Sequence, residues 1–214
     1  MKTKPQSTTT GTLTVTGDGQ IKVRPDLAIL DLDVVTTAKT AQEASQDNAQ
    51  RMSAVTEALR DVGLVSADLQ TVGYDVMPII DTDEKSPTKN KITGYRVASQ
   101  LRVRADVDRA GETIDAAIEA GANMASGIRY AVRDENSVRA RALKAAVKAA
   151  RRDADAIADS IAVKIRSVEA LEANMGGAPI LFRSFASLSA KAMTPVEPGN
   201  VDITASVRVV YRYA

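Results

Sequence analysis

The feature that most constrains the fold is a long alanine-rich segment in the second half of the chain. Ten alanines lie between Glu135 and Ala162. Apolar side chains recur there at helical spacing, at Leu143, Ala146, Ala150, Ala154, Ile157 and Ile161. Charged residues fill the opposite side, at Arg141, Lys144, Lys148, Arg151, Asp155 and Asp159. The segment predicts one helix about 40 Å long, at 1.5 Å per residue, which packs a stripe of mostly small side chains on a sheet.

Two further helices are predicted from their capping signals. Thr40 and Glu43 form a capping box, in which each side chain accepts a hydrogen bond from the backbone amide of the other residue. Gly63 supplies the left-handed residue that ends this first helix. Asp108 is expected to cap a shorter helix that ends at Gly121.

Most of the remaining chain alternates apolar and polar residues with a period of two, which is typical of strands with one buried face. The clearest case has one face made of Ala28, Leu30, Leu32 and Val34. Further strands are predicted over residues 68–80, 92–105, 128–132, 164–172 and 201–213. Residues 11–23 alternate as well, but Gly17-Asp18-Gly19 is expected to introduce a turn or a bulge.

These elements predict an α+β fold of antiparallel sheet layers with amphipathic helices packed on one side. We expect a single domain over residues 11–213, made of two intimately joined halves, about 11–106 and 107–213. Residues 1–10 are too polar to bury and are expected to be a disordered tail. Residues 174–200, with repeated Gly, Ser and Ala, are expected to be mobile or ordered only by a neighbouring subunit.

The composition excludes several classes of active site. The chain contains no His and no Cys, which removes imidazole bases, thiol nucleophiles and the usual zinc and haem ligands. We expect no bound cofactor. The 28 basic and 27 acidic side chains leave a net charge of +1, without the positive excess of a dedicated nucleic-acid-binding protein. No run of about 18 apolar residues is present, so no membrane-spanning helix is predicted.

Two acidic groups are candidate cation sites. Asp31 and Asp33 project from the same face of one strand, where they could hold a divalent cation or act as an acid/base pair. The alternative is a solvated strand face that serves solubility. Asp81, Asp83 and Glu84 could bind calcium weakly, but the ligand spacing of an EF-hand is missing, and a mobile polar loop is the alternative.

Two other groups of residues are candidate binding surfaces. Arg96, Arg102 and Arg104 line the outer face of one predicted strand and could bind phosphate groups, anionic glycans or RNA. The alternative is an exposed face that nearby acids balance. A possible oligomer interface lies in the loop-like 174–200 segment, because its apolar residues would otherwise be exposed: Ile180, Leu181, Phe182 and Phe185.

An ordered set of short motifs resembles a known family. The motifs are Thr14-Val15-Thr16-Gly17-Asp18-Gly19, Pro25-Asp26-Leu27-Ala28, Gly94-Tyr95-Arg96-Val97, the alanine-rich helix after Asp134, and Pro198-Gly199 before the last strand. In this order and spacing they resemble the SIMPL-domain family, long catalogued as a domain of unknown function. The resemblance implies a cell-envelope protein. Family members include periplasmic immunogenic proteins that form large channel-like assemblies, proteins linked to oxidative-stress tolerance, and an animal protein that binds a signalling kinase.

The resemblance favours a non-enzymatic, self-assembling periplasmic protein with a role in envelope integrity or stress tolerance. Exported family members carry a leader, so we expect the native gene to encode an export signal upstream of Lys2; the alternative is a cytoplasmic protein. An adaptor for a partner protein or an anionic polymer is the second hypothesis. A metal-dependent enzyme that uses Asp31 and Asp33 is the third. The family has no established catalytic residues that could be transferred to this sequence.

Overall fold

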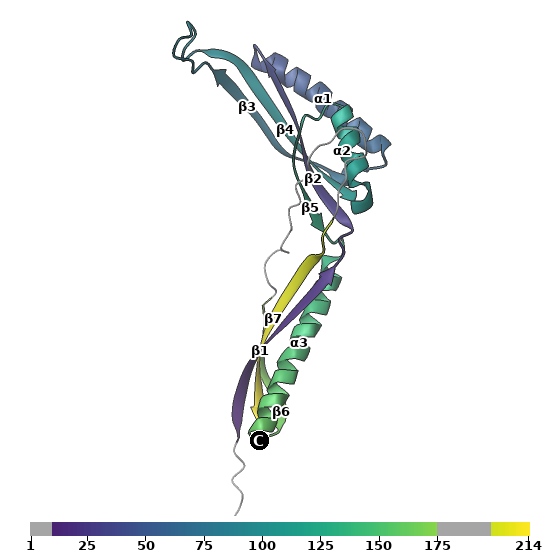
Figure 1. Ribbon diagram of the computed structural model, residues 1–214, viewed down its shortest axis with the longest axis vertical. Helices are drawn as coiled ribbons and strands as arrows, with labels where there is room; N and C mark the ends of the chain where they lie inside the picture. The colour runs from purple at the N-terminus through teal and green to yellow at the C-terminus, as the bar shows by residue number, and fades with distance from the viewer. Residues whose placement is uncertain (1–9, 175–197) are drawn as a thin grey trace, which may run out of the picture. The chain divides into compact units, whose positions relative to one another are not determined.

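The computed structural model describes residues 10–174 and 198–214, and the chain forms two compact units (Figure 1). The terminal unit is built from β1 (Gly11–Val23), α3 (Glu135–Ser160), β6 (Ile165–Asn174) and β7 (Val201–Tyr213). The central unit is built from β2 (Leu27–Ala38), α1 (Ala41–Asp61), β3 (Leu69–Ile80), β4 (Ile92–Asp106), α2 (Ala110–Glu119) and β5 (Met124–Ala131).

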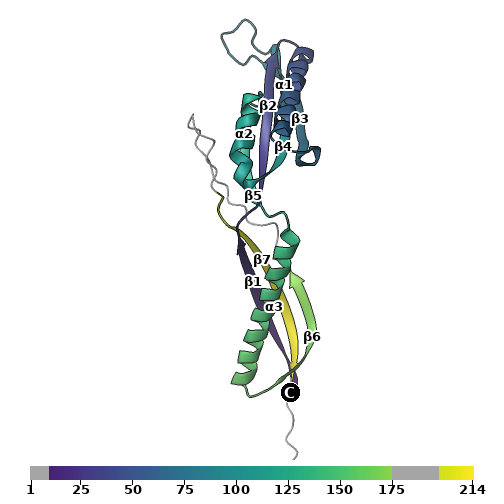
Figure 2. The ribbon, with the colours of Figure 1, turned by 90° about the vertical axis from the view of Figure 1, so that its right-hand side faces the viewer.

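Each unit is an antiparallel sheet with its helices on one face. The terminal unit has strand order β1-β7-β6, and α3 lies along β1 and β7 (Figure 2). The central unit has strand order β3-β4-β2-β5, and α1 and α2 pack on β2 and β4. The predicted α+β class, with helices on antiparallel layers, is confirmed.

The chain does not divide near residue 106, where the boundary between the two halves was expected. The chain passes from the terminal unit to the central unit between residues 24 and 25, and it returns between residues 131 and 132. The terminal unit therefore contains segments from both ends of the chain. The reason is the pairing of β1 with β7, which runs without a break from Gly11 opposite Tyr213 to Val23 opposite Val201. Thirteen residues near each end of the chain are therefore joined in one ladder, although most of the sequence lies between them.

Gly17 and Gly19 produce neither a turn nor a bulge, contrary to expectation. Both lie inside the continuous β1 ladder and face α3. A Cβ atom on Gly17 would lie 2.2 Å from the backbone oxygen of Ala146, and one on Gly19 would lie 2.1 Å from that of Ala142. The two glycines are required because the helix backbone comes too close to the strand for any side chain between them.

The close approach also selects the residues that α3 buries. Its buried line repeats mainly at every fourth residue: Val138, Ala142, Ala146, Ala150, Ala154 and Ala158. The predicted burial of Ala146, Ala150 and Ala154 is confirmed. Ile157 and Ile161, predicted for the same stripe, are 40% and 53% exposed, because only small side chains fit at this separation. Val15, Val207, Val209 and Tyr211 complete the core around the alanines.

The capping box of α1 is present as predicted. The Glu43 amide donates to Thr40 Oγ1 at 3.2 Å, and the Thr40 amide donates to Glu43 Oε2 at 3.3 Å. Gly63 follows the helix with a φ of +90°. The expected cap of α2 is wrong, because residues Val107–Arg109 form a 3₁₀ turn that places Arg109, and not Asp108, at the N-cap.

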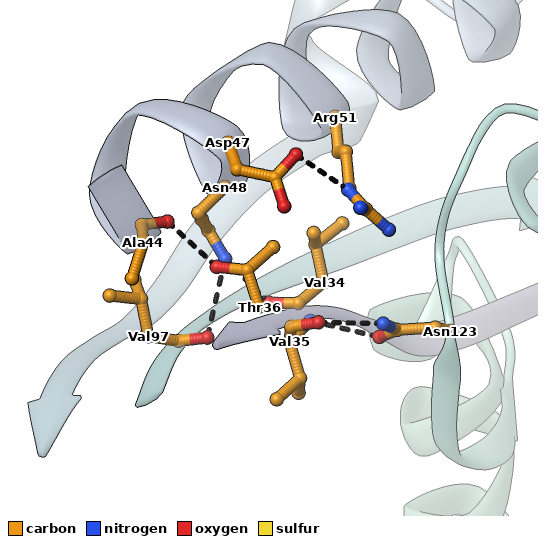
Figure 3. A network of polar contacts seen from close by, with 9 residues as sticks. All are labelled: Val34, Val35, Thr36, Ala44, Asp47, Asn48, Arg51, Val97 and Asn123. Carbon is orange, nitrogen blue, oxygen red and sulfur yellow. Dashed lines mark hydrogen bonds and ion pairs between the residues drawn. The ribbon is translucent and has the colours of Figure 1, made fainter. Parts of the chain in front are cut away.

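A buried asparagine on α1 fixes the helix to the sheet (Figure 3). Asn48 is 1% exposed, and its Nδ2 donates to the backbone oxygens of Val34 and Val97, at 2.8 and 3.4 Å. Its Oδ1 accepts from Ser99 Oγ at 2.5 Å. One side chain therefore links α1 to both central strands and satisfies its own buried polar atoms.

We expect Gly17→Ala to lower the free energy of unfolding of the terminal unit by about 1–3 kcal/mol, because the added methyl group must push α3 off β1. Gly73→Ala is the matched control, since a Cβ on this strand glycine meets its nearest atom at an ordinary 3.5 Å. Denaturant unfolding of both variants measures the difference. Equal stability of the two variants would mean that the helix does not need the glycines.

Candidate interaction surfaces

The face of the four-stranded sheet that α1 and α2 do not cover carries a charge cluster centred on Asp31. Asp31 of β2 accepts from Arg102 of β4, with Nε to Oδ1 at 2.7 Å and Nη2 to Oδ2 at 3.3 Å. Arg129 of β5 donates to the same Oδ2 at 3.3 Å. The hydrogen bond to Asp31 raises the pKa of Arg102 above its ordinary value, while desolvation partly opposes this. The carboxylate therefore joins three neighbouring strands.

Asp33 lies next along the same face but has different partners. It is 7% exposed, and its Oδ2 accepts from Ser126 Oγ at 2.8 Å. Its Oδ1 has no hydrogen-bond partner among the residues that the structure describes. A register shift between Asp31 and Leu32 breaks the β5 ladder beside Ser126, and Gly127 there has a φ of +148°. The bulge brings the serine hydroxyl to the buried carboxylate.

The geometry of Asp31 and Asp33 argues against the proposed cation site. The two residues share a face, as the sequence indicated, but two guanidinium groups already neutralise Asp31. Their positive charge repels a metal ion at this position. In residues 10–174 and 198–214 no group of three or more acidic, His or Cys side chains is gathered as a metal site.

The three arginines of the predicted anion-binding face do not form one site. All three lie on the face of β4 opposite the buried Val97, Leu101 and Val103. Arg102 is engaged by Asp31, whereas Arg96 and Arg104 are exposed. The last two stand eight residues apart on one strand, or about 26 Å at 3.3 Å per residue.

The end of the β3–β4 hairpin exposes large apolar side chains. We define the hairpin arm by its exposed members, which are Val76, Met77, Ile79, Ile80 and Ile92. Successive residues of a strand point to opposite faces, so Val76 and Met77 expose apolar groups on both faces of the sheet. Beyond Ala38, where β2 ends, the last rows of the arm are only two strands wide. The arm therefore exposes apolar side chains that α1 and α2 leave uncovered.

The loop at the tip of the arm is organised by Asp81. Its carboxylate accepts from the hydroxyls of Ser86 and Thr88, and from the backbone amide of Asp83 at 2.9 Å. These hydrogen bonds, from Ser86 first, lower the pKa of Asp81 below its ordinary value. The carboxylate that was a candidate calcium ligand is thus used to close the loop.

Edge strand β6 is a second exposed surface, in the terminal unit. Val168 and Leu171 are 53% and 50% exposed, because α3 covers β1 and β7 more than β6 (Figure 2). Glu169 pairs with Arg212 of β7 at 3.0 and 3.1 Å, and this hydrogen bonding lowers the pKa of Glu169. The strand is therefore tied to the sheet by an exposed ion pair but leaves its apolar residues uncovered.

The predicted oligomer interface cannot be placed. Ile180, Leu181, Phe182 and Phe185 lie outside the residues that the structure describes. The hairpin arm, by contrast, was not predicted as a surface of interest. Its signal is present in the sequence, because Met77-Pro78-Ile79-Ile80 is an unbroken apolar run in a strand whose earlier residues mix polar and apolar types.

Comparison with known proteins gives one family and a small set of relatives. The model of the SIMPL family, described as a protein of unknown function (DUF541), matches residues 13–211. Proteins named 26 kDa periplasmic immunogenic protein, from Brucella abortus (strain S19) and Brucella melitensis biotype 1, are 33% and 32% identical over 208 residues. These alignments cover 93% of this chain and 83% of each relative.

A more distant relative is the uncharacterized protein YggE of Edwardsiella ictaluri. It is 24% identical over 153 residues, which are 71% of this chain and 63% of that protein. Among the described residues, no helix has the length and apolar character needed to cross a membrane.

We expect Asp31→Ala to lower the free energy of unfolding of the central unit by about 1–2 kcal/mol, because it leaves two half-buried guanidinium groups without their shared acceptor. Asp75→Ala, at an exposed carboxylate on the neighbouring strand β3, is the control and should change stability by less than about 0.5 kcal/mol. Urea denaturation measures both. If the two substitutions cost the same, the cluster around Asp31 is not a structural link.

Proposed function

The chain belongs to the SIMPL family, and on that basis we propose that it is a non-enzymatic, self-assembling periplasmic protein that serves cell-envelope integrity or stress tolerance. The two relatives from Brucella, which align with this chain over 83% of their length, are named periplasmic proteins, and this supports the location. Self-assembly is supported by the exposed surfaces of the chain itself.

The hairpin arm is the observation that carries the proposal. Ile80 and Ile92 face one another across the last row of the arm and are 51% and 54% exposed. A two-stranded ribbon is marginally stable in water unless a further layer covers it. Strand β3 is also a sheet edge, whose free backbone groups are available to another strand. Another protein surface that covers the arm would remove both costs.

The non-enzymatic part of the proposal is supported by the state of the candidate groups. The chain has no His or Cys to act as a base or nucleophile. The two carboxylates suggested for catalysis are engaged in links between strands, Asp31 with two arginines and Asp33 with Ser126. Both residues therefore have a structural role, which is to link neighbouring strands of the sheet.

We expect the wild-type chain to elute as an oligomer at micromolar concentration, and Ile80→Ser with Ile92→Ser to shift it towards the 22.7 kDa monomer. Both positions are exposed, so the substitutions leave folding intact. Val65→Ser, at a 60% exposed apolar residue away from the arm, is the matched control and keeps the oligomer. Light scattering coupled to size exclusion measures the masses. A wild-type mass of 22.7 kDa contradicts self-assembly and favours the adaptor alternative.

We also expect fractionation of the source cells to recover the protein in the periplasmic fraction, because its relatives carry that location in their names. An antibody against the chain and a cytosolic marker protein suffice for the measurement. Recovery of the full-length product only with the cytosolic marker would remove the envelope assignment.

A further inference from the structure

The solvent face of α3 separates its charges along the helix. Lys144 and Lys148 stand in the first half of this face, and Asp155 and Asp159 stand in the second. The arrangement opposes the helix dipole, which favours acids near the N-terminus and bases near the C-terminus. The last turn of α3 contains no basic residue. Stability of the helix by itself therefore does not explain the order of the charges.

Neighbours on the same face repel one another as well. Lys144 and Lys148 are one turn apart, as are Lys148 and Arg152, and as are Asp155 and Asp159. Like charges at this spacing destabilise an isolated helix. Alternating signs would remove the repulsion without changing the net charge. A partner whose charges run in the opposite order would compensate this repulsion.

The charge order along this face is complementary to that of a second copy of α3 that runs in the opposite direction. If two copies of α3 run antiparallel, with the two-fold axis midway between residues 151 and 152, Lys144 faces the partner's Asp159. In the same register Lys148 faces the partner's Asp155. Val147, which is 39% exposed, then faces the partner's Ala156. These six residues line one shallow hollow on the helix. The two-fold axis places each of them opposite another member of the set on the second copy.

Each arginine of the like-charge pair at the centre has an acidic partner in its own chain, and Asp155 is shared between Arg151 and the partner's Lys148. Arg151 would face the partner's Arg152, but Arg151 binds Asp155 at 2.9 Å and Arg152 binds Asp153 at 2.9 Å. Arg151 also lies over the ring of Tyr211, with its Cζ 5.6 Å from the centroid. This contact draws its guanidinium towards β7 and away from the axis.

We propose that the solvent face of α3 packs on the same face of a second copy of this chain, antiparallel and with the two-fold axis between residues 151 and 152. The proposal rests on the proposed self-assembly and names one of its contacts. A second copy fits better than an anionic polymer, because Asp155 and Asp159 would repel a polyanion over half of the face. Surface charge pairs are individually weak, so this contact sets orientation and register within an assembly whose apolar surfaces supply affinity.

Charge reversal tests the proposal. Variant one carries Lys144→Asp, variant two carries Asp159→Lys, and variant three carries both changes, so that the ion pair between Arg151 and Asp155 is kept in all three. Each of the first two places like charges across the axis and should weaken association roughly tenfold, whereas the third restores complementarity and association. A mixture of variants one and two should also associate. Sedimentation velocity over a concentration series measures this, and circular dichroism checks folding.

Lys22→Asp is the control for variant one, because it makes the same change of charge at an exposed position outside α3. Assembly of variants one and two at the wild-type affinity overturns this proposal and leaves self-assembly standing. A wild-type chain that stays monomeric overturns both.

Cross-linking gives a readout of register that does not depend on affinity. The chain has no Cys, so introduced cysteines are the only ones present. Lys144→Cys mixed with Asp159→Cys should form a disulfide-linked dimer, whereas Lys144→Cys alone should not, because its two copies would lie about 22 Å apart along the axis. Efficient cross-linking of Lys144→Cys to itself would indicate a parallel pair and refute the antiparallel contact.

Discussion

The contact between the backbone of α3 and the two glycines of β1 is the constraint on which the terminal unit depends. Gly17 and Gly19 let the helix approach until Ala142, Ala146 and Ala150 touch the strand. At this separation the helix contributes mainly alanines to the core, while β1 and β7 supply valines and Tyr211. The same contact fixes the rotation of α3, and thereby decides which of its residues face solvent.

The central sheet carries a polar cluster on one face and exposed apolar side chains at one end. On the central sheet, Asp31 and Asp33 tie β2 to its neighbours through arginine and serine partners. At the end of the same sheet, the arm exposes isoleucine side chains that α1 and α2 do not cover. This exposed arm is the basis of the proposed self-assembly.

Local signals in the sequence predicted local structure well. The capping box at Thr40 places α1, and the alternation around Leu30 and Leu32 places β2, because each signal acts within a few residues. The class of the fold follows from these elements. Gly17 and Gly19 were misread, since a glycine required by close packing looks the same in sequence as one required by a turn.

Features that depend on distant residues were not accessible in the same way. The pairing of β1 with β7 joins the two ends of the chain, and no local pattern reports it. In the sequence, Asn48 only interrupts the apolar side of α1. Its hydrogen-bond partners Val34, Val97 and Ser99 lie on other elements and become evident only in the structure. The shared position of Asp31 and Asp33 on one face was predictable from the strand period, but the two arginines that neutralise Asp31 were not.

Amide hydrogen exchange at two protein concentrations shows whether another copy of the chain covers the arm. We expect protection of the amides of Val76, Met77, Ile79 and Ile80 to increase with concentration, because the edge of β3 becomes paired or buried. The amides of Gly17 and Gly19, inside the terminal unit, should exchange at the same rate in both samples. Exchange in the arm that is independent of concentration would mean that no second copy covers it.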